Sequence, residues 1–440
     1  MKKTLLSIIF FSFIFLSTII VSAEEYDLAA YLSKVERNNP DLLIMFKDIE
    51  LIKNDISLAR SMFLPHAGLQ GGYNRNLIER TQSMPVASQG PGPLIWGEVP
   101  ANFDNELTLG IGISQVLYSA GAISNYNKAK LGQAIRKQSY EAARLAVLCA
   151  AKKLYARAQL TLLVVEIRES SEHFSLEHYQ RVTRRHSVGA ATEMDLLLAE
   201  VDWRTKTDAV MEAKKNAELV LLAFRDLAGI PHSQSITLTQ EHTGLPEIPE
   251  TPTLDIILSN RADYRAILLS RDLNDVESKA AKKTFLPEVS ALFNYALGGM
   301  GNKSSLTGDY DFNSATFGIV VKIPISTGGS RLARIKAAKL EQEKTAIAIS
   351  QRETAIESEL LELQLRLEDA YKRIESSYRT VETARRAVTL AQTAYSNGQA
   401  TYLNVMDAQD KLDMVWLNYA NVGFEYLSAH YDWQLSTGVK

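Results

Sequence analysis

The chain has 440 residues, of which 46% are hydrophobic and 22% are charged, and its formal net charge is −3. A small negative charge excludes a protein that binds nucleic acid through a dense basic surface. The only cysteine, Cys149, excludes a disulfide framework within one chain. Its apolar helical surroundings predict a buried structural thiol rather than a reactive one.

The N-terminus has the pattern of a secretory signal peptide. Lys2 and Lys3 precede an apolar run from Leu5 to Val21, and Ala23 ends a small-residue cleavage motif. We therefore predict that residues 1–23 are a signal peptide, with an uncleaved membrane anchor as the alternative. Removing the two lysines moves the formal net charge from −3 to −5. No later apolar run reaches the ~20 residues of a membrane helix, so any membrane-spanning part is expected to consist of strands.

The mature chain contains one unit twice. A Phe-Leu-Pro triplet, a glycine before a long helix and a glycine after that helix recur in the same order. These landmarks are Phe63-Leu64-Pro65 and Phe285-Leu286-Pro287, Gly121 and Gly329, and Gly189 and Gly398. The recurrence predicts a first structural repeat over residues 24–245 and a second over 246–440. The first copy carries extra residues in Thr81 to Phe103, a Pro-, Gly- and Ser-rich stretch that predicts an enlarged loop.

Each repeat is expected to begin with a helix. In the first copy, Asn39 is placed to cap a helix whose first residue is Pro40 and which continues from Asp41 to about Met62. Its counterpart is predicted from about Ala262 to Thr284, and both helices stop before a proline.

Two strands follow in each repeat. Large apolar residues alternate with small or polar ones in 107–114 and again in 316–323, which predicts strands with two different faces. The less regular segments 67–77 and 288–297 are predicted as their partners. Each is about as long as a tilted strand that crosses a bilayer.

Long helical hairpins complete each repeat. Helices are predicted over 120–185 and 331–396, and the second has an apolar seam with alternating steps of three and four residues from Ile356 to Tyr395, as in coiled coils. Gly189 and Gly398 are expected to end these helices in the left-handed conformation. Thr192 and Thr401 are expected to cap the returning helices, 193–227 and 402–436. The proline-rich stretch 229–252 is predicted to link the repeats.

Four strands are too few to close a membrane barrel. A sheet edge left open in lipid would expose unpaired backbone groups, and the smallest bacterial barrels have about 8 strands. The chain is therefore expected to form a homo-oligomer.

Together, these motifs resemble those of the TolC family of outer-membrane efflux proteins. The matching segments are Asn39–Leu42, Phe63–Pro65, Tyr118–Gly121, Ile323–Gly329, Ser187–Gly189 and Ser396–Gly398. The resemblance implies an α+β membrane protein, mainly α, that forms a homotrimer in the outer membrane of a Gram-negative bacterium. Its fold would be a 12-stranded β-barrel, with four strands per chain, continuous with a long α-helical coiled-coil barrel in the periplasm. The loop Thr81–Phe103 would face the cell exterior.

The resemblance also implies a function without catalysis. The protein would be the exit duct of a tripartite efflux or type I secretion system, carrying small molecules or polypeptides. Its partners would be a periplasmic adaptor (membrane fusion) protein, an inner-membrane pump and outer-membrane lipid, with no cofactor, no metal and no nucleic acid. The alternative is a secreted or periplasmic coiled-coil scaffold without channel activity.

The resemblance places a gate and a contact surface at the helix tips. The implied gate residues are Asp195, Tyr395, Asn404 and Asp407. The implied adaptor contacts are Ser187, Val188, Gly189, Ala190, Asn397, Gly398, Gln399 and Ala400. Two positions depart from the family pattern, because Asn404 replaces an aspartate and Ala400 replaces an arginine that locks the gate.

Simpler interpretations of these residues remain open. Asp195 and Asp407 lie close to helix starts, where the helix dipole favours a carboxylate, and Tyr395 lies on the apolar seam, where it could only pack. Asp195 corresponds to Asn404 between the repeats, so the two tips are chemically different.

No enzyme motif is present in the sequence. His173 and His178 are five residues apart and share a helix face poorly, so they are weak metal ligands. Gly110-Ile111-Gly112 lies within a predicted strand and not at a strand-to-helix turn, which excludes a phosphate-binding loop there.

Overall fold

The computed structural model describes residues 24–86, 95–239, 245–302 and 310–438. The predicted signal peptide, residues 1–23, lies outside these ranges. The chain divides into two compact units, and each unit takes segments from both predicted repeats. We call residues 44–142 and 254–357 the sheet unit, and residues 24–43, 143–253 and 358–438 the tip unit.

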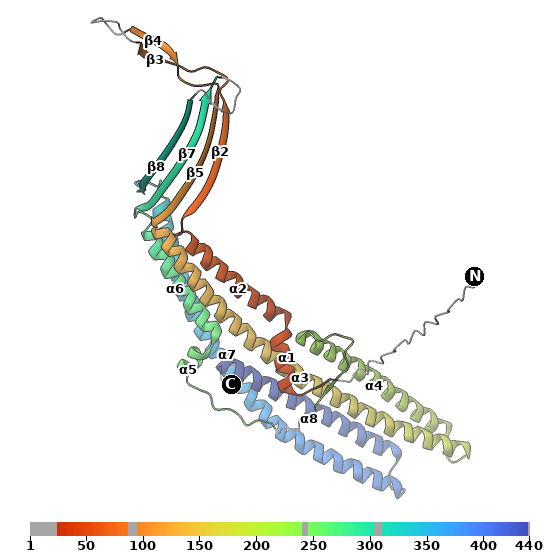
Figure 1. Ribbon diagram of the computed structural model, residues 1–440. Helices are drawn as coiled ribbons and strands as arrows, with labels where there is room; N and C mark the ends of the chain where they lie inside the picture. Colours follow the sequence, from red (N-terminus) through yellow and green to blue (C-terminus); the bar gives the residue numbers. More distant parts are fainter. Residues whose placement is uncertain (1–23, 87–94, 240–244, 303–309, 439–440) are drawn as a thin grey trace, which may run out of the picture. The chain divides into compact units, whose positions relative to one another are not determined.

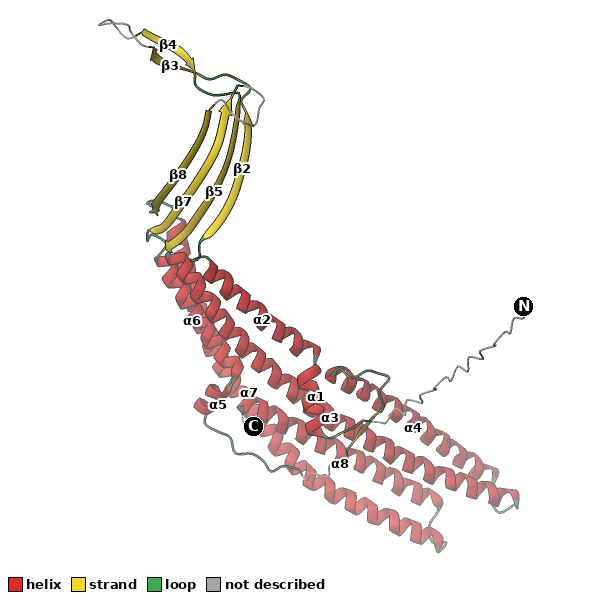
Figure 2. Cartoon of the chain, in the orientation of Figure 1, coloured by secondary structure: helices red, strands yellow, loops and turns green. Residues whose placement is uncertain are grey.

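The sheet unit is built on four long antiparallel strands (Figures 1 and 2). They are β2 (His66–Arg75), β5 (Asn105–Tyr118), β7 (Glu288–Gly301) and β8 (Tyr310–Lys322). Their order is β2-β5-β7-β8, with each neighbouring pair antiparallel. The four predicted strands are confirmed, and pairing between β5 and β7 joins the two repeats.

The strand register gives the sheet one apolar face. Leu69, Ile111, Tyr295 and Ala315 form one row across the four strands, because each is the Cα partner of the next. Since side chains alternate along a strand, residues two apart share this face. Its large exposed side chains are Leu69, Tyr73, Leu109, Ile111, Phe293, Tyr295, Leu297, Phe317, Ile319 and Val321. The opposite face is mainly glycine and polar residues, such as Gly68, Gln70, Thr108, Ser114, Asn294 and Thr316.

The stretch predicted as an enlarged loop contains a β-hairpin. Within Thr81–Phe103, β3 (Thr81–Val86) pairs with β4 (Ile95–Pro100) in antiparallel register. The prediction of a loop is therefore wrong for residues 81–86 and 95–100. The stretch was interpreted from its many Pro, Gly and Ser residues, although Ile95, Trp96 and Val99 favour a strand. Trp96 is 64% exposed.

The helices follow the predicted boundaries closely. They are α2 (Pro40–Ser61), α3 (Ala120–Ser187), α4 (Glu193–Ala228), α6 (Ala262–Lys282), α7 (Ser330–Ser396) and α8 (Tyr402–Thr437). The predicted cap before α2 is confirmed, since the Asn39 Oδ1 atom accepts a 3.1 Å hydrogen bond from the Leu42 amide. Across the described ranges, no helix combines the length and the apolar character needed to cross a bilayer.

The core of the tip unit includes elements that the sequence analysis did not predict. These are β1 (Glu24–Tyr26), α1 (Leu28–Asn38) and β6 (Ile236–Leu238), with β1 and β6 paired in parallel. Tyr31 of α1 is fully buried and packs with Phe224 and Tyr155. The predicted linker therefore contains a strand. The short α5 (Leu254–Asn260) was also missed.

The predicted coiled-coil seam of α7 is buried over most of its length and half-buried at Tyr395 near the tip. Its residues Leu360, Leu367 and Val381 are at most 8% exposed, and Leu367 belongs to a cluster with Tyr426 and Trp433 of α8. The step pattern of three and four residues thus identified the packing face of this helix.

An ion-pair cluster in the sheet unit makes a pH-dependent contribution to stability. The Asp263 carboxylate accepts a 3.0 Å hydrogen bond from Arg261 and a bond from Arg352. Burial by itself raises the pKa of Asp263, but the two arginines outweigh it and hold the pKa at about 2. Because the folded pKa lies below the unfolded value, this stabilisation is complete above about pH 4 and is lost as pH falls toward 2.

We expect Asp263→Asn to lower the free energy of unfolding by about 1–2 kcal/mol at pH 7, a figure reduced for the partial exposure of the carboxylate. The loss should shrink near pH 3. Thermal unfolding followed by circular dichroism at both pH values measures it, with Asp255→Asn on the exposed side of α5 as the control. An equal loss at both pH values would contradict the ion-pair assignment.

Candidate functional site

The two helix tips have the same turn. Gly189 and Gly398 have φ values of 74° and 75°. The Ala190 amide donates to the Arg185 carbonyl and the Gln399 amide donates to the Ala394 carbonyl, each at 2.8 Å. A left-handed glycine with a hydrogen bond that reaches back five residues is the Schellman motif. The prediction that Gly189 and Gly398 end these helices in the left-handed conformation is therefore confirmed.

Each returning helix begins with a threonine that is bonded to the side chain three residues later. The Thr192 hydroxyl donates to the Asp195 carboxylate at 2.7 Å, and the Asp195 amide donates back to the hydroxyl at 3.1 Å. The Thr401 hydroxyl donates to the Asn404 side-chain oxygen at 2.7 Å. Two hydrogen bonds hold the pKa of Asp195 below its ordinary value. The bond from the Thr192 side chain has the larger effect, and the bond from the Thr192 amide has the next largest. The predicted cap by the Thr192 side chain is confirmed, whereas Thr401 occupies the cap position and its amide and hydroxyl donate to the Asn404 side chain.

The predicted gate residues each have a local partner. Asp195 and Asn404 serve in the caps, and Asp407 forms a 2.6 Å ion pair with Lys411 one turn along α8. The Tyr395 ring lies edge-on to Tyr402, with centroids 5.8 Å apart. Among the described residues, no hydrogen bond or ion pair joins one of the four to another. A gate formed by these residues therefore stays a prediction.

The predicted adaptor contacts are accessible. Ser187, Gly189, Ala190 and all of 397–399 are exposed, Ala400 is half-buried, and Val188 is 77% exposed. Their role as contacts stays a prediction. Next to them, α4 exposes an apolar stripe that the sequence analysis missed: Met194, Leu197, Leu198 and Val201. Counted from Met194, the other three residues lie three, four and seven positions further on, which places all four on one face of a helix. This pattern could have been found in the sequence.

Tyr402, the first residue of α8, is a second feature that the sequence did not indicate. Its ring packs against His178 and Phe174 of α3 and against Tyr395 of α7. His178 is therefore engaged in packing between helices. Within the residues that the structure describes, no group of His, Cys, Asp or Glu side chains is placed to hold a metal ion.

Cys149 is a buried thiol, as predicted. Burial is the main reason that its pKa rises to about 11, and the nearby Asp432 carboxylate adds to this effect. A thiol with a raised pKa is a poor nucleophile at neutral pH.

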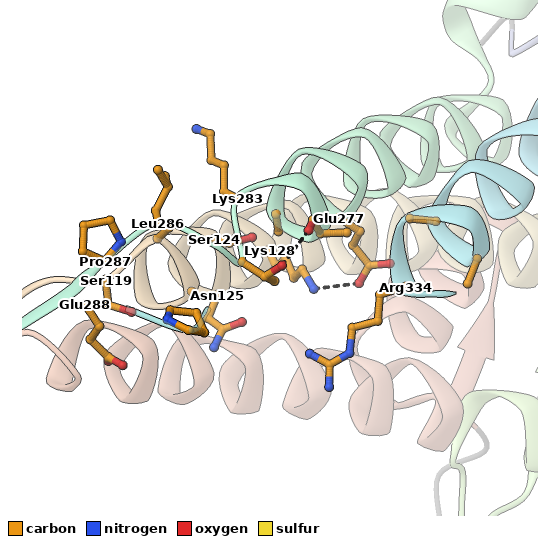
Figure 3. Close-up of a pocket in the computed structure, with 18 of the residues that line it drawn as sticks. Ser119, Ser124, Asn125, Lys128, Glu277, Lys283, Leu286, Pro287, Glu288 and Arg334 are labelled. Atoms are coloured by element: carbon orange, nitrogen blue, oxygen red, sulfur yellow. Dashed lines mark hydrogen bonds and ion pairs between the residues drawn. The ribbon is translucent and has the colours of Figure 1, made fainter. Parts of the chain in front are cut away.

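A pocket lies at the strand-to-helix junctions of the sheet unit (Figure 3). Its volume is about 690 Å³, and it is lined by the first turns of α3, the end of α6 and part of α7. Lys128 points toward Glu277 and pairs with it at 2.9 Å. Glu288 and Lys322, which are Cα partners on the polar face of the sheet, also line it. The pocket is thus a recess that carries charged side chains on the polar side of the sheet.

An antiparallel sheet with one exposed apolar face, joined in the chain to long helical hairpins, defines the class of outer-membrane channels. The model of the outer membrane efflux protein family matches residues 31–229 and 253–432. The chain belongs to this family. The predicted family and the outer-membrane location, with a part extending into the periplasm, are confirmed.

Individual relatives are distant. The chain is 22% identical to outer membrane protein TolC of Vibrio cholerae over 324 residues, which is 71% of this chain and 68% of the relative. It is 20% identical to alkaline protease secretion protein AprF of Pseudomonas aeruginosa over 312 residues, which is 70% of this chain and 63% of AprF.

The fold matches solved channels. The crystal structure of the Campylobacter jejuni CmeC outer membrane channel superimposes with a TM-score of 0.76 at 17% identity, covering 93% of this chain and 85% of CmeC. This likeness shows the shared fold. The family is one of channels and not of enzymes.

Proposed function

We propose that three copies of this chain form the outer-membrane exit duct of a tripartite transport system. The duct would receive cargo from an inner-membrane pump through a periplasmic adaptor protein and release it outside the cell. The observation that carries this proposal is the four-stranded sheet, which has two unpaired edges and one exposed apolar face.

The strand directions favour a closed ring of copies. In the order β2-β5-β7-β8 every neighbour is antiparallel, so the edge strands β2 and β8 run in opposite directions. If copies are related by rotation about one axis, β8 of one copy meets β2 of the next in antiparallel register. Such a ring pairs every strand edge, as a bilayer requires.

The two faces of the sheet fit the two environments of a membrane barrel. The exposed apolar row of Ile111, Tyr295 and its neighbours would contact lipid, and the polar and glycine-rich face would line the water-filled interior. The charged recess at Lys128 and Glu277 would then lie on the inner wall.

A trimer fits a duct better than a dimer does. Two copies would give a barrel of about 8 strands, whose interior is filled by side chains. Three copies would give about 12 strands and leave an open passage. The glycines of the polar face, such as Gly110 and Gly112, keep that passage clear.

The helix tips would serve as the gated periplasmic entrance. The gate would comprise Asp195, Tyr395, Asn404 and Asp407, with the exposed turns 187–190 and 397–400 as adaptor contacts. Because Asn404 and Ala400 lack the charges of the family pattern, this entrance would be held by fewer ion pairs. The name of AprF refers to protease secretion and the family is described as one of efflux proteins, so the cargo would be polypeptides or small molecules.

Purification from outer membranes in mild detergent tests the proposal. We expect a complex with the mass of three chains and stepwise ion conductance after insertion into planar bilayers. Denaturation by heat in detergent should return the monomer. A soluble monomer without conductance would contradict the duct and favour the coiled-coil scaffold.

A further inference from the structure

The start of α8 is held by an aromatic contact between the two helical hairpins of the tip unit. The Tyr402 ring lies face to face with the His178 imidazole, with 6° between their planes. Phe174 stacks at 6.3 Å and Tyr395 meets the same ring edge-on at 5.8 Å. Tyr402 thus joins α3 of the first hairpin to the second tip, directly after the turn at Gly398.

The contact leaves polar atoms without partners. His178 is only 6% exposed, and among the described residues its Nδ1 atom and the Tyr402 hydroxyl are buried without a hydrogen bond. Buried polar atoms that lack partners are uncommon and carry a cost. Ring packing is therefore what joins the two residues, and both polar atoms would become hydrated if the contact opened.

Burial and two nearby arginines disfavour a proton on His178. Burial is the main cause that lowers the pKa of His178 to about 4, and Arg181 and Arg185 on α3 lower it further. On α4, Asp195 opposes this effect. The Tyr402 side of the contact faces Asp202 of α4 and Asp410 of α8, together with Tyr395 of α7.

We propose that His178 is a proton-sensitive latch that fixes the second helix tip in its resting position. Neutral His178 stacks on Tyr402 and holds the first turn of α8 against α3. A protonated imidazole in this site would be a buried cation beside two arginines, with Nδ1–H lacking an acceptor. Acidification would therefore separate the two rings and release the start of α8.

Acidification acts in the direction of release. The histidine pKa is lower in the closed contact than in water, so protons bind more tightly to the open state. Stability of the closed contact is complete above about pH 6.5 and is lost as pH falls toward 4. The latch depends on the proposed channel function only when it is tested by conductance.

The test reports opening through the exposure of a buried side chain. Val405, one turn after Tyr402, is 2% exposed, whereas Leu403 is 70% exposed. In a Cys149→Ala background, Val405→Cys and Leu403→Cys provide a buried and an exposed thiol on the same turn. The ratio of their labelling rates with a maleimide cancels the direct effect of pH on thiol reactivity.

We expect this ratio to rise about tenfold or more between pH 7 and pH 4.5, while the helical circular dichroism signal is unchanged. His178→Phe, which keeps a stacking ring without titratable nitrogens, should give a ratio that is independent of pH. His178→Gln should give a ratio that is high at both pH values. The control is His173→Phe on the exposed side of the same helix, which should behave as the parent.

A flat ratio in the parent protein would overturn the proposal, as would a pH response that persists in His178→Phe. Bilayer conductance provides a separate measurement, and it should rise at acid pH only when His178 is present. If no variant conducts but the labelling ratio responds to pH through His178, the channel proposal fails and the latch stands.

Discussion

Replacing Phe293 by arginine is expected to prevent assembly of the protein in the outer membrane. Phe293 lies in the middle of β7, where its Cα partners are Ile113 and Phe317, and its side chain is on the apolar face. An arginine on a lipid-facing strand costs about 2–4 kcal/mol near the bilayer midplane. A ring of three copies would carry this cost three times. The amount of heat-dissociable trimer in the outer-membrane fraction, relative to total protein, measures the effect.

The matched control is the next residue in the same strand. Asn294 has Gly112 and Thr316 as Cα partners and lies on the polar face. Asn294→Arg should assemble as the parent does and shift the ion selectivity of the channel toward anions, because the new charge would line the water-filled interior. Equal tolerance of both variants, or failure of Asn294→Arg alone, would contradict the assignment of the two faces.

Features that repeat with a local period were predictable from the sequence. Strict alternation located β5 and β8, and steps of three and four residues located the buried seam of α7 that includes Leu367. The turn chemistry was equally local. Gly189 and Gly398 adopt the left-handed conformation at the tips because other residues are strained there.

Features that depend on distant partners were not predictable. Strand β1 has only three residues, and its strand conformation depends on pairing with β6, where Tyr26 lies opposite Leu238. Such a segment is too short for any period to emerge. His178 and Tyr402 lie on different hairpins, and nothing in their own neighbourhoods marks either residue as part of a contact. The cap role of Asp195 was recognisable from Thr192 three residues earlier, whereas its gate role stays a prediction.

The aromatic core of the tip unit should be the most sensitive site to truncation. Phe224 is fully buried, stacks on Tyr31 with ring centroids 3.6 Å apart, and meets Tyr26 edge-on at 6.2 Å. We expect Phe224→Ala to lower the free energy of unfolding by about 3–5 kcal/mol, because it removes this packing and leaves a cavity between α1 and α4. The midpoint of thermal unfolding and the rate of proteolysis in the tip unit measure the loss.

The matched variant for this core separates packing from hydrogen bonding. The Tyr31 hydroxyl donates to the Phe224 carbonyl at 3.2 Å, so Tyr31→Phe removes one hydrogen bond and keeps the stacked ring. Its expected cost is about 0.5–1.5 kcal/mol. A larger loss for Tyr31→Phe than for Phe224→Ala would show that the hydrogen bond dominates. A larger loss for Phe224→Ala than for Tyr31→Phe is the expected result. It would mean that the N-terminal segment is anchored by the stacking of the α1 ring on the α4 ring, because β1 contributes only three residues to its sheet.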